Sequence, residues 1–410
     1  MPRLNVDSFL ADAGHAEKIV RWVREKKAGG FCVFGGTAQS VAQIVKELRS
    51  IKDDLLFSCD CEFGLPMRLT EGGTEFPDAM AIAKTGETAL ARKAGAAIAK
   101  EMGALGLGWN FAPVADVNSN PKNPIVNTRS FGETPEVVSE YATAFMSGLQ
   151  SEGVRATAKH FPGHGDTSVD SHRELPIIER SLEEFQRVEL PPFHKLIERG
   201  VASVMTGHLS APELAKAFGA SEEEAAYPAT LSRALTTSLL REHFGFSGVI
   251  VTDSLEMHAI TTHFGEREAA LLSFEAGTDI LLMPNDPDVM FDALFEAVQK
   301  GRIAPKAVME RVDRIRTLKE KAYIESSSIN PARLDTWNEK HAKLSKEIAG
   351  KAVEVLGTVD ISDAEIIILA DERGTATEKA NYFAERLLAK AKTSAIYTPQ
   401  TWPTRKALND

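Results

Sequence analysis

The sequence predicts an α/β protein: a TIM-like (β/α)8 barrel with a short C-terminal βα extension. Short apolar runs alternate along the chain with longer amphipathic segments, a pattern typical of a parallel sheet covered by helices. About eight such units fall within roughly the first 320 residues, and (β/α)8 barrels with insertions have ~250 residues or more. An open doubly wound sheet is the alternative.

The predicted strands are short apolar runs bounded by glycine or charged residues. They lie at residues 30–34, 55–60, 105–111, 153–160, 202–208, 248–253 and 279–284, and a shorter run at 4–6 would supply an eighth. The predicted helices lie between them, at residues 16–27, 40–50, 88–102, 135–152, 181–199, 232–243, 266–276 and 288–300. Runs that are apolar at every position indicate strands buried on both faces, as in a parallel sheet.

The pattern changes after residue 325. Residues 1–325 are predicted to form the barrel, 326–355 a linker with a connecting helix, and 356–410 a partial α/β extension. The extension is predicted to contain a strand, a helix and a second strand, at residues 364–370, 377–392 and 394–397. One βα unit cannot cover both faces of its own sheet. Either the extension packs on the barrel or the chain is a fragment of a longer protein.

The composition argues against several classes of protein. The chain has 410 residues, of which 43% are hydrophobic, so it can bury a large core. A net charge of -11 and the lack of a basic run argue against nucleic acid as a partner. No apolar run approaches the ~20 residues of a membrane span. No signal peptide is recognisable, so we expect a cytoplasmic protein, or a periplasmic one if a leader precedes Met1.

The three cysteines, Cys32, Cys59 and Cys61, lie in or beside predicted strands. Free cysteine in such a position behaves as a small apolar residue. No C-x-x-C spacing is present. We therefore expect buried thiols, without a disulfide between them and without a metal site.

The densest cluster of titratable residues follows the predicted strand at 153–160. The run KHFPGHGDT occupies residues 159–167, and Asp170 and His172 come shortly after it. Folding alone does not explain such a cluster, because each polar group needs a partner or water if it is buried. In parallel α/β proteins, chemistry is built at the carboxyl ends of strands. The run therefore predicts an active site.

Asp253 ends another predicted strand and is followed by a loop. A carboxylate in this position can be an active-site anion. It can equally cap the next helix, which is a frequent role of aspartate. Position alone leaves both interpretations open.

Six stretches match one known family when they are taken together. They are residues 60–68, with a D-x-E-x-G segment and an arginine, and residues 110–116, 127–132, 159–172, 251–257 and 276–282. Together they resemble family 3 of the glycoside hydrolases, specifically its bacterial β-N-acetylglucosaminidase branch. The resemblance covers residues 1 to about 325. One departure is Phe63, which stands where the family's D-x-E-G-G form has glycine, and we expect it to narrow the site.

The resemblance implies a retaining exo-β-N-acetylglucosaminidase that acts on small glycosides, such as muropeptide fragments or chitooligosaccharides, without a metal or organic cofactor. Asp253 matches the family's nucleophile, His172 its general acid/base, and Asp170 the residue that orients this histidine. Cleavage through an oxocarbenium-like state requires an anion below the anomeric carbon and a proton donor at the leaving oxygen. A carboxylate beside the imidazole would fix its tautomer and support its charged form.

The resemblance also implies contacts with the sugar. The matching positions for hydroxyl binding are Asp60, Arg68, Arg129, Lys159 and His160. His208 and Met257 would line the pocket. Charge-assisted hydrogen bonds of this kind are strong and selective. The alternative is that the charged residues form a structural ion-pair ring at the barrel mouth and that His208 and Met257 only pack there.

Two other functions remain open. A glycoside phosphorylase could use the same aspartate, because histidine in place of a second carboxylic acid removes a charge that would repel phosphate. A sugar-binding barrel without activity is the other alternative, since fold does not guarantee catalysis.

Overall fold

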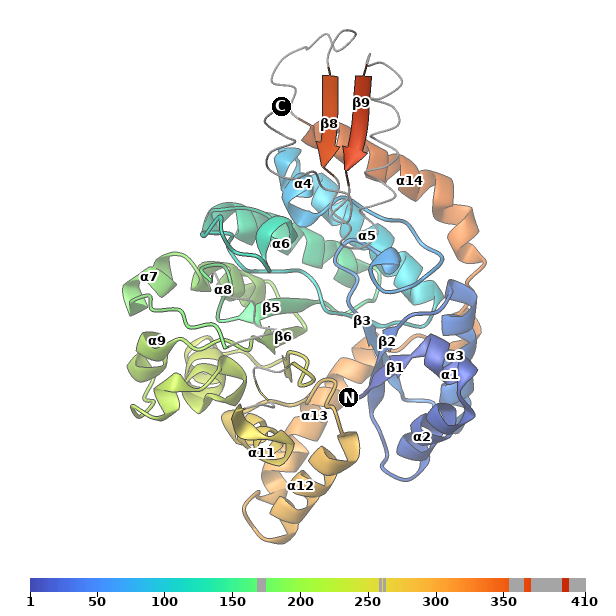
Figure 1. Ribbon diagram of the computed structural model, residues 1–410. Helices are drawn as coiled ribbons and strands as arrows, with labels where there is room; N and C mark the ends of the chain where they lie inside the picture. The colour runs from blue at the N-terminus through green and yellow to red at the C-terminus, as the bar shows by residue number, and fades with distance from the viewer. Residues whose placement is uncertain (168–174, 258–259, 261–262, 354–364, 370–392, 398–410) are drawn as a thin grey trace. The chain divides into compact units, whose positions relative to one another are not determined.

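The structure is a computed structural model that describes residues 1–167, 175–257, 260, 263–353, 365–369 and 393–397 (Figure 1). The chain divides into two compact units, Met1–Ala352 and Val353–Asp410. The α/β class predicted from the sequence is confirmed, because parallel strands alternate with helices through the first unit.

The strands of the first unit form two parallel sheets. The first has the order β1 (Arg3–Asn5), β2 (Gly30–Phe34), β3 (Leu56–Cys59) and β4 (Trp109–Asn110). The second has the order β5 (Thr157–Phe161), β6 (Ser203–Thr206) and β7 (Val249–Thr252). All neighbouring pairs are parallel, so the carboxyl ends within each sheet lie on one side.

Further backbone contacts extend from the edges of both sheets. Trp109 and Val114, from the segment of β4, form parallel bridges with Arg155 and Lys159 beside and within β5. On the other edge, Val251 of β7 bridges Ile280. The chain just beyond that bridge reaches β1: Met283 N donates to Met1 O at 2.8 Å, and the amino group of Met1 donates to Leu281 O at 2.7 Å.

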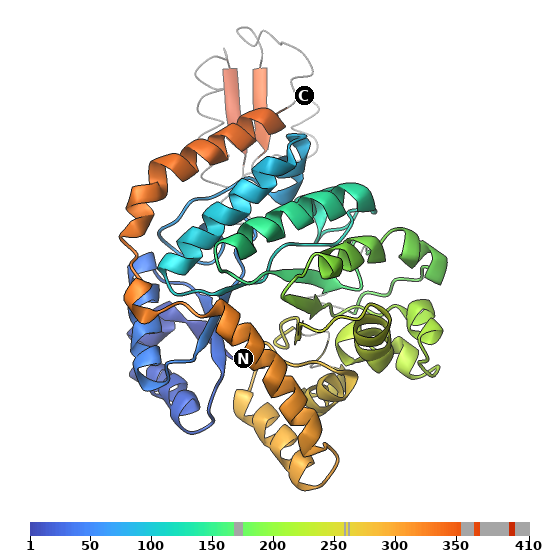
Figure 2. The same ribbon diagram turned by 180° about the vertical axis from the view of Figure 1, so that it is seen from behind.

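Helices connect the strands and pack around the sheets. The longer ones are α2 (Ala13–Arg24), α3 (Ala38–Ile51), α5 (Thr88–Ala104), α6 (Pro135–Ser151), α8 (Leu190–Glu198), α11 (Glu266–Ala276), α12 (Pro287–Gln299), α13 (Pro305–Ala322) and α14 (Arg333–Ala352). The shorter ones are α1 (Val6–Ala11), α4 (Ala79–Lys84), α7 (Leu182–Arg187) and α9 (Pro212–Ala217), and the π-helix η5 (Ala234–His243) lies between α9 and β7 along the chain. Helices α5 and α6 lie side by side in both views (Figure 2).

Several boundaries differ from the prediction. The predicted helix at 181–199 is two helices, α7 and α8, and the predicted strand at 279–284 forms one bridge, at Ile280. Helix α13 was not predicted at all. It buries Leu318 and Ala322, and Val308, Val312 and Ile315 continue the same apolar stripe, but half of its residues are charged and mask this periodicity.

One apolar cluster is shared by the two sheets. It contains Cys32, Leu56, Trp109, Phe111, Met205, Val249, Val251, Ile280 and Leu282, among others. Trp109 of the first sheet donates from Nε1 to Ser203 Oγ of the second at 2.8 Å. Burying apolar surface at ~25 cal/mol per Å² makes such a cluster a major source of stability. All three cysteines are buried and free, as predicted.

The last helix of the first unit, α14, covers α4 and α5. His341 Nδ1 lies 2.6 Å from Glu101 Oε1, and the other oxygen of Glu101 accepts from Thr74 N at 2.8 Å. The connecting helix predicted within residues 326–355 thus exists, from Arg333 to Ala352.

In the second unit, β8 (Glu365–Leu369) and β9 (Thr393–Tyr397) pair in parallel. The helix predicted at 377–392 lies outside the described residues. Among the residues that the structure describes, no helix is long and apolar enough to cross a membrane.

Candidate active site

Polar side chains gather at the carboxyl ends of the strands. Asp60 directly follows β3, Lys159 and His160 belong to the end of β5, and Asp253 directly follows β7. Because neighbouring parallel strands end on the same side, residues distant in sequence meet there. Lys159 Nζ lies 2.9 Å from Asp60 Oδ1 although the two residues are 99 positions apart.

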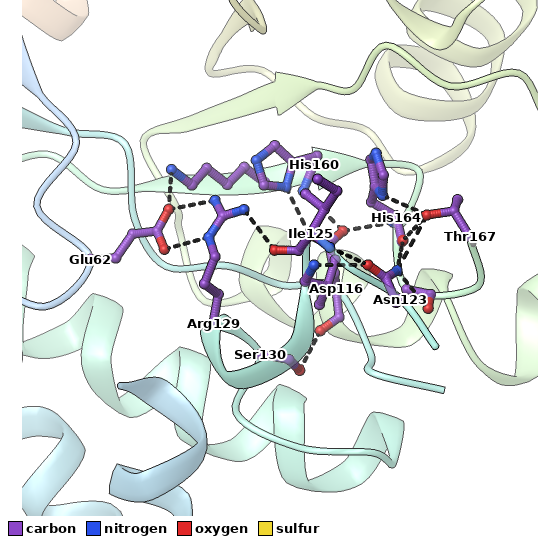
Figure 3. Close-up of polar contacts among 12 residues, drawn as sticks. Glu62, Asp116, Asn123, Ile125, Arg129, Ser130, His160, His164 and Thr167 are labelled. Carbon is purple, nitrogen blue, oxygen red and sulfur yellow. Dashed lines mark hydrogen bonds and ion pairs between the residues drawn. The ribbon is translucent and has the colours of Figure 1, made fainter. Parts of the chain in front are cut away.

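Lys159 is the centre of an ion network. Its side chain is 2% exposed, and its ammonium group also lies 2.7 Å from Glu62 Oε1. Arg68 donates to the other oxygen of Asp60 at 3.0 Å. On the far side, Arg129 donates to Glu62 from Nε at 2.9 Å and from Nη2 at 2.7 Å (Figure 3). Three cations thus alternate with two anions across the site.

The network holds its members in their charged forms. Burial raises the pKa of the Asp60 carboxyl, but Lys159 and Arg68 outweigh burial and the pKa is lowered. Arg129 and Lys159 act in the same way on Glu62, whose pKa falls well below its usual value despite burial. Burial lowers the pKa of Lys159, yet Asp60 and Glu62 raise it above its usual value. The charged forms are therefore favoured although the groups are desolvated.

His160 is fixed by a residue that had no predicted role, Asp116. Its ring Nδ1 lies 2.8 Å from Asp116 Oδ2, and its backbone N–H donates to Oδ1 at 3.1 Å. The N–H of His164 donates to the same oxygen at 2.8 Å (Figure 3). Asp116 occurs in one of the matched motifs, but nothing in the sequence indicates which histidine it contacts.

The loop after β5 is tightly packed on the neighbouring loop. Asn123 donates from Nδ2 to the carbonyl oxygens of His164 and Gly165 at 2.8 and 3.0 Å. A Cβ at Gly165 would lie 1.6 Å from Val117 O, so a larger residue would displace the backbone. His164 Nδ1 forms a hydrogen bond of 3.1 Å with Thr167 Oγ1. Burial lowers the pKa of the His164 ring. His164 therefore favours the neutral form.

Asp253 is partly exposed at the end of β7. Among the described residues its carboxylate accepts one hydrogen bond, from Ser254 N at 2.7 Å. Burial raises the pKa of Asp253, but electrostatic interactions with His160 and His208, the Ser254 N–H and the charge of Lys159 together lower it. An ionised and accessible carboxylate can attack an electrophilic carbon.

His208 supports the loop that follows Asp253. It is fully buried, with Nδ1 2.8 Å from Thr230 Oγ1 and Nε2 2.8 Å from Ser254 O. Met257 is partly exposed in the same loop. Both ring nitrogens of His208 therefore have protein partners close to Asp253.

Asp170 and His172 lie outside the described residues. The chain on both sides of that segment is joined by an ion pair, because Arg180 Nε donates to Asp166 Oδ2 at 2.7 Å. Arg180 also lies 3.1 Å from Glu189 Oε1, a carboxylate with no exposed surface. Burial raises the pKa of Glu189 to about 8. Sequence reasoning did not single out this acid, since one glutamate in a helical segment carries no signal.

The chain is similar to known proteins. The model of the glycosyl hydrolase family 3 N terminal domain matches residues 6–318. Beta-hexosaminidase A of Pseudoalteromonas piscicida is 34% identical over 351 residues, and the match covers 79% of this chain but only 58% of that relative. The chain thus spans less than two thirds of the relative's length.

Solved structures are similar as well. A glycoside hydrolase family 3 beta-N-acetylglucosaminidase from Paenibacillus sp. str. FPU-7 has a TM-score of 0.81 and 31% identity, covering 95% of this chain and 77% of its own. The beta-glucoside phosphorylase BglX has a TM-score of 0.83 and 26% identity, and the match covers 97% of this chain and 77% of the BglX chain.

Proposed function

Because the chain belongs to glycosyl hydrolase family 3, we propose that it is a retaining exo-β-N-acetylglucosaminidase acting on small glycosides of the muropeptide or chitooligosaccharide type. The observation that carries the proposal is the state of Asp253: a partly exposed carboxylate with a lowered pKa, beside the ion network of Lys159. Similarity to a beta-hexosaminidase and to a family 3 beta-N-acetylglucosaminidase supports the sugar specificity.

In the proposed mechanism, Asp253 attacks the anomeric carbon and forms a glycosyl-enzyme, while His172 protonates the leaving oxygen. His172 then takes a proton from water, which attacks the anomeric carbon and releases the sugar. Asp170 orients His172 and supports its charged form. The roles of His172 and Asp170 rest on the resemblance of residues 159–172 to the family motif.

The ion network would recognise the sugar hydroxyls. Asp60, Arg68, Arg129, Lys159 and His160 are the proposed contacts. Their charges are compensated within the protein, so a hydroxyl would enter an existing set of charge-assisted hydrogen bonds. A substrate that lacks the hydroxyl would leave buried charged groups without that bond, and selectivity follows.

We further propose that the two sheets belong to one (β/α)8 barrel, with residues 280–283 completing it beside β1. The bridges at both sheet edges and the shared apolar cluster support this arrangement. In this proposal residues 1–325 form the catalytic barrel, 326–355 the linker and connecting helix, and 356–410 a partial α/β extension. The division of the chain after Ala352 supports a separate C-terminal part.

One specific observation favours a second candidate, a glycoside phosphorylase. The ion network has three cations and two anions, and an excess of positive charge would tolerate incoming phosphate. Similarity to the phosphorylase BglX points the same way, at lower identity than to the acetylglucosaminidase.

The decisive experiment measures release of p-nitrophenol from its β-N-acetylglucosaminide, with and without phosphate, together with product identification. Hydrolysis predicts free N-acetylglucosamine at a rate that phosphate does not change. Appearance of the sugar 1-phosphate would establish the phosphorylase instead. Binding of N-acetylglucosamine without turnover of any aryl glycoside would point to a sugar-binding barrel. Asp253→Asn serves as the inactive control.

A further inference from the structure

Asp116 is a buried carboxylate in the centre of the candidate active site. The segment after β4 brings it beside β5, where Ala115 N donates to Lys159 O at 2.7 Å. Asp116 has no exposed surface. Its two oxygens accept from His160 Nδ1, His160 N and His164 N, at 2.8, 3.1 and 2.8 Å. Ser130 Oγ donates to its backbone oxygen at 2.7 Å and so fixes its main chain (Figure 3).

A carboxylate buried in this way requires compensation, because an unpaired ion is costly in the protein interior. Among the described residues, the ring of His160 is the ionisable group within ion-pair distance of Asp116. The charged side chains of the site that lie nearby are otherwise engaged. Arg129 donates two hydrogen bonds to Glu62, and Lys159 is shared by Asp60 and Glu62. Asp116 and His160 therefore form a pair distinct from the ion network.

The second ring nitrogen of His160 connects this pair to the chemistry. Within the described part of the chain, His160 Nε2 has no hydrogen-bond partner, since the bonds of this residue run through Nδ1 and the backbone. The charge of His160 also acts on Asp253, where it is the first of the interactions that oppose the effect of burial on the pKa. His160 thus interacts electrostatically with two carboxylates, those of Asp116 and Asp253.

We infer that Asp116 is a positioning residue of this site: it holds Nδ1 of His160 so that Nε2 of the ring stays available to the substrate that reacts at Asp253. In this arrangement the carboxylate of Asp116 orients the imidazole, and the imidazole acts electrostatically on the carboxylate of Asp253. The inference rests on the proposed function because that function gives Asp253 its role. The contact between Asp116 and His160 is independent of the proposed function.

Other titratable groups act on the same pair. They are His164 from the loop after β5, Arg129 from the 3-10 helix at Asn127–Arg129, Glu189 before α8, and His208 and Lys159 through Asp253. His164 and Arg129 contact neither ring nitrogen of His160, and Glu189 is another acid. None can replace the carboxylate of Asp116 at Nδ1 of His160. Substitution of Asp116 therefore removes the anionic partner of this ring.

The test compares wild type with Asp116→Asn, whose amide keeps the shape of the side chain but removes its charge. The charged form of His160 loses an anionic partner, so Asp253 loses positive charge and its pKa rises. The acidic limb of the profile of kcat/KM against pH, which requires ionised Asp253, should move to higher pH. We expect kcat/KM at neutral pH to fall about 10- to 100-fold, as is usual when the outer partner of a site residue is removed.

Two further variants distinguish positioning from a structural role. Ser130→Ala removes a contact to the backbone of Asp116 and not to its carboxylate, so it should leave the acidic limb in place. His160→Gln should move the limb in the same direction as Asp116→Asn, and the double variant should move it no further. Shifts of the acidic limb that add up in the double variant would overturn the inference. An unmoved limb in folded Asp116→Asn would do the same.

A measurement without substrate separates this inference from the proposed function. In wild type, the NMR signals of the His160 ring should report a proton on Nδ1, and these signals should change in Asp116→Asn but not in Ser130→Ala. If wild type turned over no glycoside, the proposed function would fail, but this measurement would still test the contact between Asp116 and His160. Unchanged ring signals of His160 in Asp116→Asn would overturn the inference. If Asp116→Asn does not fold, a wild-type spectrum with the neutral ring protonated on Nε2 contradicts the inference.

Discussion

The guanidinium of Arg129 and the carboxylate of Glu62 form two parallel hydrogen bonds, of 2.9 and 2.7 Å. The Glu62 side chain is 9% exposed, and Lys159 lies 2.7 Å from the same carboxylate. Paired, fork-shaped geometry of this kind is the strong form of the arginine–carboxylate interaction. Glu62 therefore connects the buried Lys159 with the partly exposed Arg129, although the sequence motif gave it no role.

We predict that Glu62→Gln destabilises the protein by about 3 kcal/mol at pH 7, because it leaves Arg129 without its counter-charge and Lys159 with Asp60 alone. The effect depends on pH. Since the pKa of Glu62 is lowered well below its usual value on folding, its stabilisation is complete above the unfolded pKa of about 4.3 and is lost as the pH falls further. Urea unfolding at pH 7 and pH 3.5 measures both.

The matched control for Glu62→Gln is Glu140→Gln, an exposed residue of α6. Its free energy of unfolding should stay within about 0.5 kcal/mol of wild type. A Glu62→Gln protein as stable as this control at pH 7 would show that the network contributes nothing to folding.

Asp253→Asn should abolish turnover, because no other group would occupy the position below the anomeric carbon. A mechanism-based fluorosugar inactivator that keeps the 2-acetamido group should label Asp253 in wild type, and peptide mass spectrometry locates the label. Glu256 is the nearby alternative, but Arg3 lies 2.5 Å from its carboxylate. Label on Glu256 or Glu62 would refute the assignment of the nucleophile.

His172→Ala should slow hydrolysis by ~10²–10⁴-fold for glycosides with poor leaving groups and far less for activated aryl glycosides in the glycosylation step. An activated leaving group departs almost without a proton, so the acid is needed only for the poor one. Pre-steady-state measurements on a series of aryl glycosides isolate this step. A uniform loss across the series speaks against proton donation by His172.

The sequence predicted the existence of most strands and helices better than their ends. Strand β2 is buried at four of its five positions and apolar along its length, so the run is visible by itself. Helix α13 is mostly exposed, and half of its residues are charged, which masks the apolar stripe that it carries. The predicted strand at 105–111 shrinks to Trp109–Asn110, because sheet pairing sets the ends of a strand and local composition does not.

The site was predicted in part. The motif positions identified Asp60, Lys159 and Asp253, and the structure places each at the carboxyl end of a strand. Their partners could not be predicted, because the contact between His160 and Asp116 joins residues 44 positions apart. Spacing along the chain carries no information on such a pair. The roles of His172 and Asp170 stay predictions.

Glu189 offers a pH-dependent test of the packing beneath the loop at 162–167. Its carboxyl group has no exposed surface, and within the described residues Oε2 has no hydrogen-bond partner. Gly163 packs against it, since a Cβ there would lie 2.7 Å from Oε2. Burial raises the pKa of Glu189 to about 8 although Arg180 opposes this effect.

The raised pKa fixes the sign of the prediction. The native state binds this proton between the unfolded pKa of about 4.3 and the folded value of about 8. The stability that it contributes is complete below that window and is lost as the pH rises through it. Between pH 5 and pH 8, wild type should therefore lose on the order of 3 kcal/mol that Glu189→Gln does not lose. Thermal and urea unfolding of both proteins across this pH range measures the difference. The control is Glu183→Gln, at an exposed position of α7. Parallel stability profiles for wild type and Glu189→Gln would mean that Glu189 is already ionised at pH 5 and that Arg180 compensates its burial.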